Sequence, residues 1–220
     1  MLTSTEENYL KAIFKISESE KKAVSTNALA DMLGTSAASV TDMLKKLSEK
    51  ELINYKKYHG VSLTPNGNKY ATKLVRKHRL WEVFLVDKLR FSWDQVHDIA
   101  EELEHIKSDE LVSRLDAFLD YPKFDPHGDP IPNADGKFTI RNQFQLSDLT
   151  SGHEAMVVGV KKHDTSFLQY LNNLKIKIGS TIHVKSIVAY DKSMNILVNN
   201  KEEAMISHQT AQSLLMKRVS

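Results

Sequence analysis

Two short helical segments separated by one glycine constrain the fold of this chain more than any other feature. The segment STNALADMLG begins with Ser25 or Thr26 as a helix N-cap and ends at Gly34. The next segment, TSAASVTDMLKKLSEKELI, begins with Thr35 or Ser36 as its N-cap. Its apolar residues recur at helical spacing: Val40, Met43, Leu44 and Leu47. Two helices joined by a tight turn at a glycine predict a helix-turn-helix.

The segments on either side extend this motif. The segment LINYKKYHGVSLT consists of two β-rich runs around YHG, which is typical of a hairpin. Before the motif, STEE resembles a capping box and opens an amphipathic helix. The apolar face of that helix comprises Tyr9, Leu10, Ile13, Phe14 and Ile16. A helix-turn-helix followed by a hairpin predicts a winged helix.

The rest of the chain changes from helical to β-rich. PNGNKYATKLVRKHRLWEVFLVDKL predicts a long helix, and SWDQVHDIAEELEHIKSDELVSRLDAFL predicts one or two more, with Ser92 and Ser108 as caps. Residues 121–138 contain four of the five prolines and predict an irregular linker. From Gln143 onward, short β-branched runs predict a small β-barrel or β-rich domain, with a short helix in TSFLQYLNNL. We therefore expect an α+β protein.

Charge is distributed unevenly along the chain. Residues 1–79 hold 14 Lys and Arg against 8 Asp and Glu (net +6), residues 80–145 hold 7 against 14 (net −7), and residues 146–220 hold 9 against 6 (net +3). The basic N-terminal segment suits binding of a polyanion, and the acidic middle segment suits binding of a cation. The chain has no cysteine, which excludes disulfides, thiolate zinc sites and a cysteine nucleophile. With neither an apolar run of about 20 residues nor secretory-signal features at its start, we expect a cytoplasmic protein.

The acidic middle contains a column of ligand-type side chains in VHDIAEELEH. Residues three and four apart share a helix face, which groups His97, Glu101, Glu104 and His105. On the preceding helix, His78 and Glu82 are four residues apart. Oxygen and imidazole ligands suit Mn²⁺, Fe²⁺, Co²⁺ or Zn²⁺. The pattern leaves two interpretations open, a metal site or a solvated charged face.

A metal-dependent enzyme is a second way to use such ligands. Glu102 and His105 have the Glu-x-x-His spacing of di-iron bundle proteins, which need a second copy on another helix. The second copy is absent from the sequence, and so is the zinc-protease pattern H-E-x-x-H. Neither catalytic pattern is complete, so we expect a protein that is not an enzyme.

The winged helix predicts a DNA surface. In a helix-turn-helix, the N-terminal residues of the second helix contact base edges, which assigns that role to Ser36, Ala37, Ala38, Ser39, Thr41 and Asp42. Basic and polar residues nearby would contact phosphates: Lys45, Lys46, Lys56, Lys57 and His59. In the other interpretation, the lysines form a solvated face and the winged helix binds only protein.

Several segments in order resemble the diphtheria-toxin-repressor family of metal-dependent transcriptional repressors. They are ENYLKAIF, SVTDMLKKLSEKELI, YHGVSLTPNG, RKHRLWEVFL, WDQVHDIAEELEHIKSDELVSRL and DPHGDPIP. The resemblance covers essentially the whole chain. It implies a winged helix over residues 1–71, a helical metal-binding and dimerisation domain with a Pro-rich linker over 72–142, and a small β-barrel similar to ferrous-transport A domains over 143–220.

The resemblance also implies two metal sites. The primary site would comprise Asn8, Glu101, Glu104 and His105. The ancillary site would comprise His78, Glu82, His97, Asp125 and His127, with His163 or Asp164 added from the C-terminal domain.

Three positions bear on the metal that the resemblance implies. Glu101 stands where the iron-responsive branch carries cysteine, which favours Mn²⁺ with Fe²⁺ as the second choice. Asn8 offers a neutral amide where the family usually has Met or Asp. Lys11 stands where some two-manganese members have a carboxylate, which argues against a tightly binuclear site. The implied function is a metal-activated, homodimeric repressor that binds palindromic operator DNA of metal-uptake genes.

Overall fold

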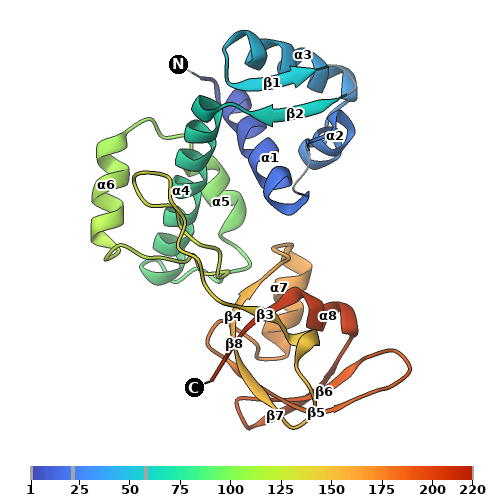
Figure 1. Cartoon of the computed structure of the whole chain (residues 1–220). Coiled ribbons are helices and arrows are strands. Elements are labelled where there is room, and N and C mark those ends of the chain that lie inside the picture. The colour runs from blue at the N-terminus through green and yellow to red at the C-terminus, as the bar shows by residue number, and fades with distance from the viewer. Residues whose placement is uncertain (1, 21–22, 57–58, 220) are drawn as a thin grey trace. The chain divides into compact units, whose positions relative to one another are not determined.

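The computed structural model describes residues 2–20, 23–56 and 59–219. The chain forms two compact units. One unit comprises Met1–His78, Glu101–Val112 and Pro132–Phe138, and the other comprises Arg79–Ala100, Ser113–Ile131 and Thr139–Ser220. The boundary falls inside helix α4 (Pro65–Asp87), so this one helix contributes residues to both units (Figure 1).

The first unit begins with three helices whose ends follow the local sequence. Helix α1 (Ser4–Glu20) begins with a reciprocal pair in which the Glu6 N–H donates to the Thr3 hydroxyl and the Thr3 N–H donates to the Glu6 carboxylate. Ser25 caps α2 (Thr26–Leu33) and Ser36 caps α3 (Ala37–Glu49). Gly34 joins α2 to α3 in the left-handed conformation, with a φ of 61° that side chains rarely adopt. This turn produces the expected helix-turn-helix.

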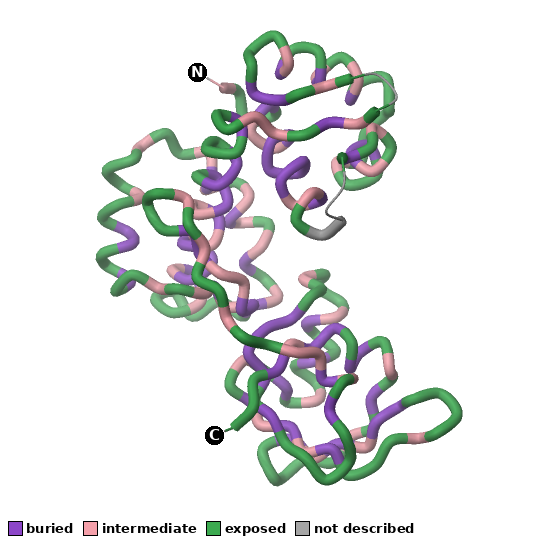
Figure 2. The backbone as a smooth tube through the Cα atoms, in the orientation of Figure 1, coloured by how far each residue is buried: buried purple, intermediate pink, exposed green. Residues whose placement is uncertain are grey.

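A two-stranded wing completes the motif. Strands β1 (Ile53–Lys56) and β2 (Gly60–Leu63) pair antiparallel. Lys57, predicted to contact phosphate at the tip of this hairpin, lies outside the described residues. One apolar core joins α1, α2, α3 and the wing, and the buried positions follow the inner side of each element (Figure 2). The second helix of the motif, α3, therefore shares one close-packed core with α1.

Helices α4, α5 (His97–Leu103) and α6 (Asp109–Phe118) correspond to the long helical region. The Ser108 hydroxyl accepts the N–H of Leu111 and so caps α6 as expected, whereas Ser92 precedes α5 by five residues. Helix α5 ends at Leu103, so Glu104 and His105 lie in the following turn and not on one continuous helical face with His97. Within the described ranges, no helix has both the length and the apolar character needed to cross a membrane.

The C-terminal part is a six-stranded antiparallel sheet with strand order β3-β8-β4-β5-β6-β7. The strands are β3 (Phe144–Gln145), β4 (Glu154–Val160), β5 (Thr181–Ile187), β6 (Met194–Val198), β7 (Glu202–Ile206) and β8 (Leu214–Arg218). A short 3-10 helix (Leu146–Asp148) and helices α7 (Thr165–Asn173) and α8 (His208–Ser213) accompany them. Over residues 139–219, β3 and β7 are the two edges of the sheet and do not pair, so the sheet is open and the expected closed barrel is not confirmed.

The irregular linker is ordered by its own polar groups. The Asp125 carboxylate accepts the N–H groups of His127 (2.8 Å) and Asp129 (3.0 Å). The carbonyl of His127 accepts the N–H of Val160 at 3.0 Å, which fixes the turn against β4. Gly128 has a φ of 89°, and a Cβ there would lie 2.1 Å from the carbonyl oxygen of Val158. The turn can approach β4 this closely because residue 128 has no side chain.

Candidate DNA surface and metal centres

The start of α3 presents small, exposed side chains, as the DNA prediction requires. The Ser36 hydroxyl accepts the Ser39 N–H at 3.1 Å, and the Thr41 hydroxyl donates to the Ala37 carbonyl at 2.8 Å. These hydroxyls are already engaged in local bonds, and Ala37 and Ala38 offer only methyl groups. This surface therefore allows close approach of α3 to a DNA groove, but it offers few free side-chain hydrogen-bonding groups.

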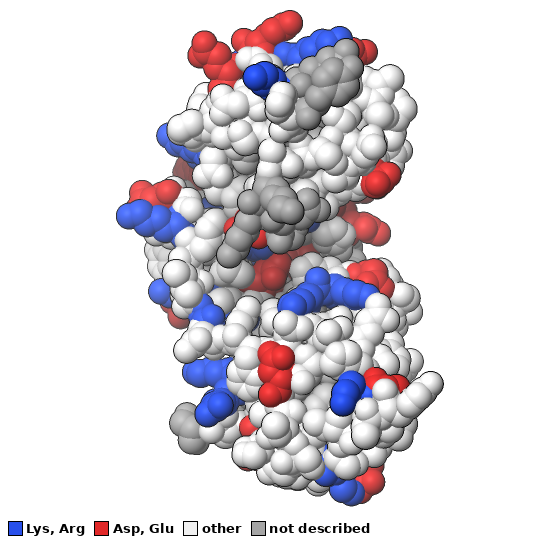
Figure 3. Space-filling model, turned by 45° about the vertical axis from the view of Figure 1, so that its right-hand side comes forward, with Lys and Arg blue, Asp and Glu red and all other residues white. Residues whose placement is uncertain are grey.

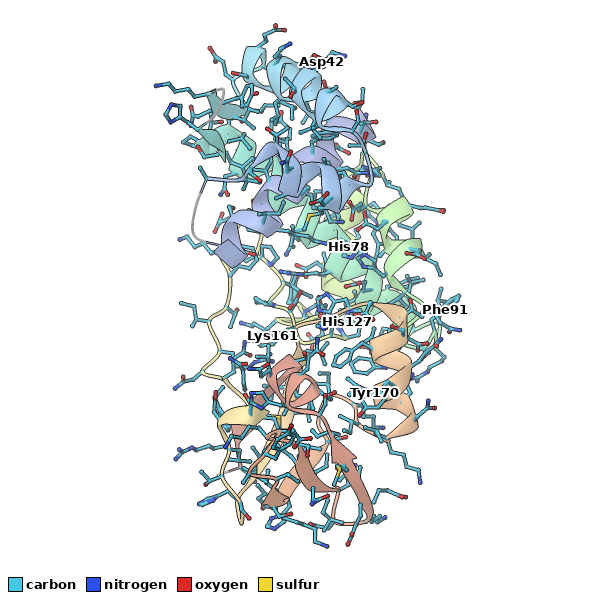
Figure 4. The ribbon with its side chains drawn as sticks, turned by 90° about the vertical axis from the view of Figure 1, so that its right-hand side faces the viewer. Asp42, His78, Phe91, His127, Lys161 and Tyr170 are labelled. Carbon is cyan, nitrogen blue, oxygen red and sulfur yellow. The ribbon has the colours of Figure 1, made fainter. Side chains whose placement is uncertain are left out.

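Charged residues flank this surface. Asp42, marked on α3 in Figure 4, forms an exposed ion pair with Lys45 at 3.2 Å, while Lys46, Lys56 and His59 are exposed. Figure 3 shows Lys and Arg side chains lying among Asp and Glu side chains on the face that it draws. Lysines on such a surface can contact phosphates, a role that supplies affinity and register but little sequence information.

All four predicted primary-site residues belong to the first unit, and two of them, Glu101 and Glu104, meet at Lys11 of α1. Lys11 on α1 is 4% exposed, and its ammonium donates to Glu101 Oε1 and to Glu104 Oε2, each at 2.6 Å. The imidazole Nδ1 of His78, from α4 (Figure 4), lies 2.7 Å from Glu104 Oε2 and 3.3 Å from the Lys11 ammonium. We call Asn8, Lys11, His78, Glu101, Glu104 and His105 the primary cluster. His78, which the resemblance assigned to the ancillary site, instead contacts Lys11 and Glu104 here.

His105 has a carboxylate partner that the sequence interpretation missed. Its Nδ1 lies 2.6 Å from Glu7 Oε2, and both side chains are mostly buried. A carboxylate on one ring nitrogen fixes the orientation of the imidazole and raises the basicity of the other nitrogen. Glu7 sits one position before Asn8 and could have been noticed only as an acidic residue on the first turn of α1.

Two buried oxygens test whether this cluster fits a cation. Asn8 Oδ1 and Glu104 Oε1 are buried and have no hydrogen-bond partner among the described residues, and Glu104 is fully buried. Each unsatisfied buried acceptor costs about 1–3 kcal/mol. Burial raises the pKa of Glu101, but the charge and hydrogen bond of Lys11 outweigh it, so the pKa lies below its ordinary value. An ionised Glu101 and two unpartnered buried oxygens fit a divalent cation.

A second cluster lies in the second unit. Ligand atoms of Glu82, Asp125 and His127 all lie within 4.8 Å of one another, and all three residues are buried (Figure 4 labels His127). Glu82 Oε1 is 3.5 Å from His97 Nδ1 and 3.7 Å from His127 Nδ1. The His127 Nε2 donates to the Trp93 carbonyl oxygen at 2.8 Å, and Nδ1 faces the Glu82 carboxylate. We call Glu82, His97, Asp125 and His127 the ancillary cluster.

The electrostatics of the ancillary cluster also fit a cation. Burial, together with the negative charges of Glu82 and Asp129, raises the pKa of Asp125 to about 7. Burial lowers the pKa of His127, but its neighbours, first of all Glu82, outweigh this and raise the pKa to about 9. Negative charge that is this concentrated is stabilised by protons when no metal is bound. A divalent cation could take the place of those protons.

The structure separates the two C-terminal candidates. The His163 ring lies 4.9 Å from the His127 ring, and its Nε2 is 3.9 Å from Asp129 Oδ2. Asp164 caps helix α7 instead, accepting the Phe167 N–H at 3.0 Å and the Ser166 hydroxyl at 2.7 Å, and it is exposed. The structure thus brings His163 to the ancillary cluster and does not bring Asp164 there.

Family comparisons match three successive segments of the chain. Residues 1–61 match the family model described as the N-terminal DNA binding domain of the iron dependent repressor. Residues 64–133 match the model of the metal binding and dimerisation domain of the same repressor. Residues 144–218 match the FeoA domain.

Whole-protein comparisons agree. The structure of a manganese-dependent transcriptional repressor in complex with manganese is 34% identical, with a TM-score of 0.86, covering 97% of this chain and 100% of that one. The iron-dependent repressor IdeR of Mycobacterium leprae is 26% identical and covers 99% of both chains. A probable metal transport system membrane protein of Chlamydia trachomatis is 49% identical over 79 residues, 36% of this chain and only 18% of that protein. The chain belongs to the diphtheria-toxin-repressor family of metal-dependent transcriptional repressors.

Proposed function

We propose that this chain is a cytoplasmic, homodimeric repressor that binds a palindromic operator of metal-uptake genes when Mn²⁺, or secondarily Fe²⁺, occupies the primary cluster. The proposed domains are a winged helix over residues 1–71, a metal-binding and dimerisation domain over 72–142 and a C-terminal domain over 143–220. The ligands proposed for the primary cluster are Asn8, Glu101, Glu104 and His105. Those proposed for the ancillary cluster are Glu82, His97, Asp125, His127 and His163.

One observation carries the proposal: the winged helix and the primary cluster share one compact unit, and α1 belongs to both. The apolar side of α1 packs in the core with α2 and α3, while Lys11 on the same helix contacts Glu101 and Asn8 on it holds a buried, unpartnered oxygen. A change in how the cluster holds α1 therefore acts directly on the helix that carries the DNA surface.

The chain's own groups define the switch. A bound divalent ion would supply the positive charge that the unpartnered oxygens Asn8 Oδ1 and Glu104 Oε1 lack. Asn8 lies on α1, and Glu104 and His105 lie in the turn after α5, so shared ligation ties these two elements together. In a two-fold dimer the two α3 helices must present themselves about 34 Å apart, one turn of DNA. A 100-fold gain in operator affinity corresponds to about 2.7 kcal/mol of coupling.

The donor set supports manganese. The proposed ligands of both clusters are carboxylate, amide and imidazole groups, and the chain has no cysteine. Hard oxygen ligands suit Mn²⁺, whereas thiolates select softer ions. A relative that is 34% identical was solved in complex with manganese. Fe²⁺ remains the second candidate because affinity alone follows the order of the metal series and cellular availability decides between them.

The test is fluorescence anisotropy of the full chain on DNA upstream of its own gene, at one salt concentration, during a Mn²⁺ titration. We expect tight binding only with metal, and its loss in the double variant Glu104→Ala, His105→Ala. Glu102→Ala is the matched control, because Glu102 is an exposed carboxylate on α5 next to the cluster. Equal operator affinity with and without metal would refute the proposal.

Two other functions gain less support. Members of the family are transcriptional repressors and not enzymes, so a metal-dependent enzyme is not supported. A winged helix that binds only protein would show a salt-insensitive interaction in the absence of DNA. Repeating the anisotropy experiment at several salt concentrations distinguishes that case, because binding to phosphates weakens steeply with added salt.

A further inference from the structure

We infer that a basic pocket on α4, separate from both metal clusters, binds a small free anion that carries two or more phosphate groups. The pocket lies wholly within the first unit, between the N-terminal part of α4 and the turn formed by residues 133–136. We call it the α4 pocket. The inference goes beyond the proposed function and holds whether or not the primary cluster binds metal.

Three cationic side chains line one side of the α4 pocket. Lys69, Lys73 and Arg76 follow one another at spacings of four and three residues, so they share one face of α4. Asp135 is the one acidic residue among the described residues that line the pocket, so three positive charges against one negative leave a net charge of +2. A cleft lined mainly by one sign of charge concentrates ions of the opposite sign. The pocket therefore suits a multivalent anion.

Two of these cations are available to a ligand. Lys69 is exposed and forms no hydrogen bond or ion pair with any other residue that the structure describes. Lys73 pairs with Asp109 at 3.0 Å, but both side chains are exposed. Exposed pairs of this kind contribute little to stability, so the Lys73 ammonium can turn to a phosphate at small cost.

The turn opposite α4 is held in place without a ligand. Arg76 is half-buried, and its guanidinium donates to the carbonyl oxygen of Pro132 at 2.7 Å, just before the turn. Gly136 in the turn has a φ of 77°, and a Cβ there would lie 3.2 Å from the hydroxyl oxygen of Thr72 on α4. The turn thus packs closely on the helix. A pocket that is already formed requires less ordering when its ligand binds.

The size and the polarity of the α4 pocket narrow the class of ligand. Its volume is about 420 Å³, near the lower end of the roughly 300–1,000 Å³ that is usual for ligand pockets. Pro65 and Ala134 are the apolar side chains among its described lining residues, and none of these residues is aromatic. The pocket therefore offers no ring on which a nucleobase could stack, and it suits a compact phosphorylated metabolite better than a nucleotide.

The turn also supplies a neutral donor. Asn133 Oδ1 accepts the N–H groups of Asp135 at 3.0 Å and Lys137 at 2.9 Å. These bonds orient the Asn133 amide and leave its NH₂ group to donate to a phosphate oxygen. Because the turn walls one side of the basic face of α4, the site favours a small free anion over the backbone of a DNA duplex.

The test is isothermal titration calorimetry of the full chain with inorganic diphosphate, in the absence of divalent metal because diphosphate itself binds such ions. We expect one diphosphate per chain. The double variant Lys69→Met, Lys73→Met should weaken this binding about tenfold or more, because it removes two charge-assisted hydrogen bonds. Asp135→Asn should instead tighten it about threefold, because a like charge leaves the pocket. A variant that had merely lost its fold would not bind more tightly.

The matched control is the double variant Lys45→Met, Lys46→Met. It removes the same charge from the same unit, and Lys45, like Lys73, forms an exposed ion pair, with Asp42 at 3.2 Å. This control should leave diphosphate affinity nearly unchanged. An equal loss of affinity in the two double variants would overturn the inference, and so would the absence of saturable binding to the unaltered chain.

Operator binding distinguishes a free phosphate compound from the phosphates of DNA. We expect Lys69→Met with Lys73→Met to leave the salt dependence of operator binding unchanged. A salt dependence flattened by about two units would place DNA phosphates at these lysines and overturn the assignment to a small anion. Operator binding that does not depend on metal would refute the proposed function but would not alter the diphosphate result.

Discussion

Gly128→Ala is predicted to separate the linker turn from the C-terminal sheet. An added Cβ would lie 2.1 Å from the Val158 carbonyl oxygen and 2.4 Å from the Gly159 Cα, where ordinary contact begins at 3.4 Å. The turn must therefore move by more than 1 Å, and overpacking of this kind costs about 1–3 kcal/mol. The positive φ of 89° adds about 1–2 kcal/mol for any residue with a side chain.

Gly179→Ala is the control that carries the cost of the positive φ without the cost of overpacking. Gly179 has a φ of 88°, but a Cβ there would have nothing within 4 Å. By differential scanning calorimetry we expect the melting temperature to fall by about 9 °C for Gly128→Ala and about 3 °C for Gly179→Ala, taking about 3 °C per kcal/mol. Because Asp125 and His127 lie in the displaced turn, calorimetric titration should show ancillary Mn²⁺ affinity reduced tenfold or more only in Gly128→Ala. Equal effects of the two variants would refute the reasoning.

Three further predictions concern α1 and α3. Asn8→Asp should raise primary-cluster Mn²⁺ affinity about tenfold in competition titrations, because the buried Oδ1 would belong to a charged ligand; unchanged affinity would remove Asn8 from the site. Lys46→Ala should weaken operator and nonspecific DNA alike and flatten the salt dependence by about one unit per lost phosphate contact, whereas loss confined to one sequence would indicate base contact. Leu44→Ala empties a fully buried position on α3 and should cost about 2–5 kcal/mol in denaturant unfolding; a smaller loss would mean that α3 is not firmly packed.

Local sequence rules predicted the winged helix well. Gly34 and the caps Ser25 and Ser36 lie where a helix-turn-helix needs them, and these signals depend only on neighbouring residues. The same rules wrongly placed Glu104 and His105 on one helix face with His97. Helical spacing alone does not indicate that α5 ends at Leu103.

The details of the sites depend on contacts between distant residues. Lys11 reaches Glu101 across 90 positions of sequence and Glu104 across 93, so no local pattern pairs them. The choice between His163 and Asp164 was open because both are ligand types, and the cap on α7 engages only Asp164. The open sheet likewise depends on which strands pair at long range, which alternating hydrophobicity does not specify.

The most direct test of the central claim is Mn²⁺ affinity at the primary cluster, measured with and without operator DNA at fixed salt. If metal ligation and DNA binding are coupled through α1, thermodynamic linkage requires that operator DNA tighten Mn²⁺ binding by the same factor by which Mn²⁺ tightens DNA binding, about 100-fold for a coupling of about 2.7 kcal/mol. Equal Mn²⁺ affinity in the two conditions would contradict the account and leave the primary cluster without a regulatory role.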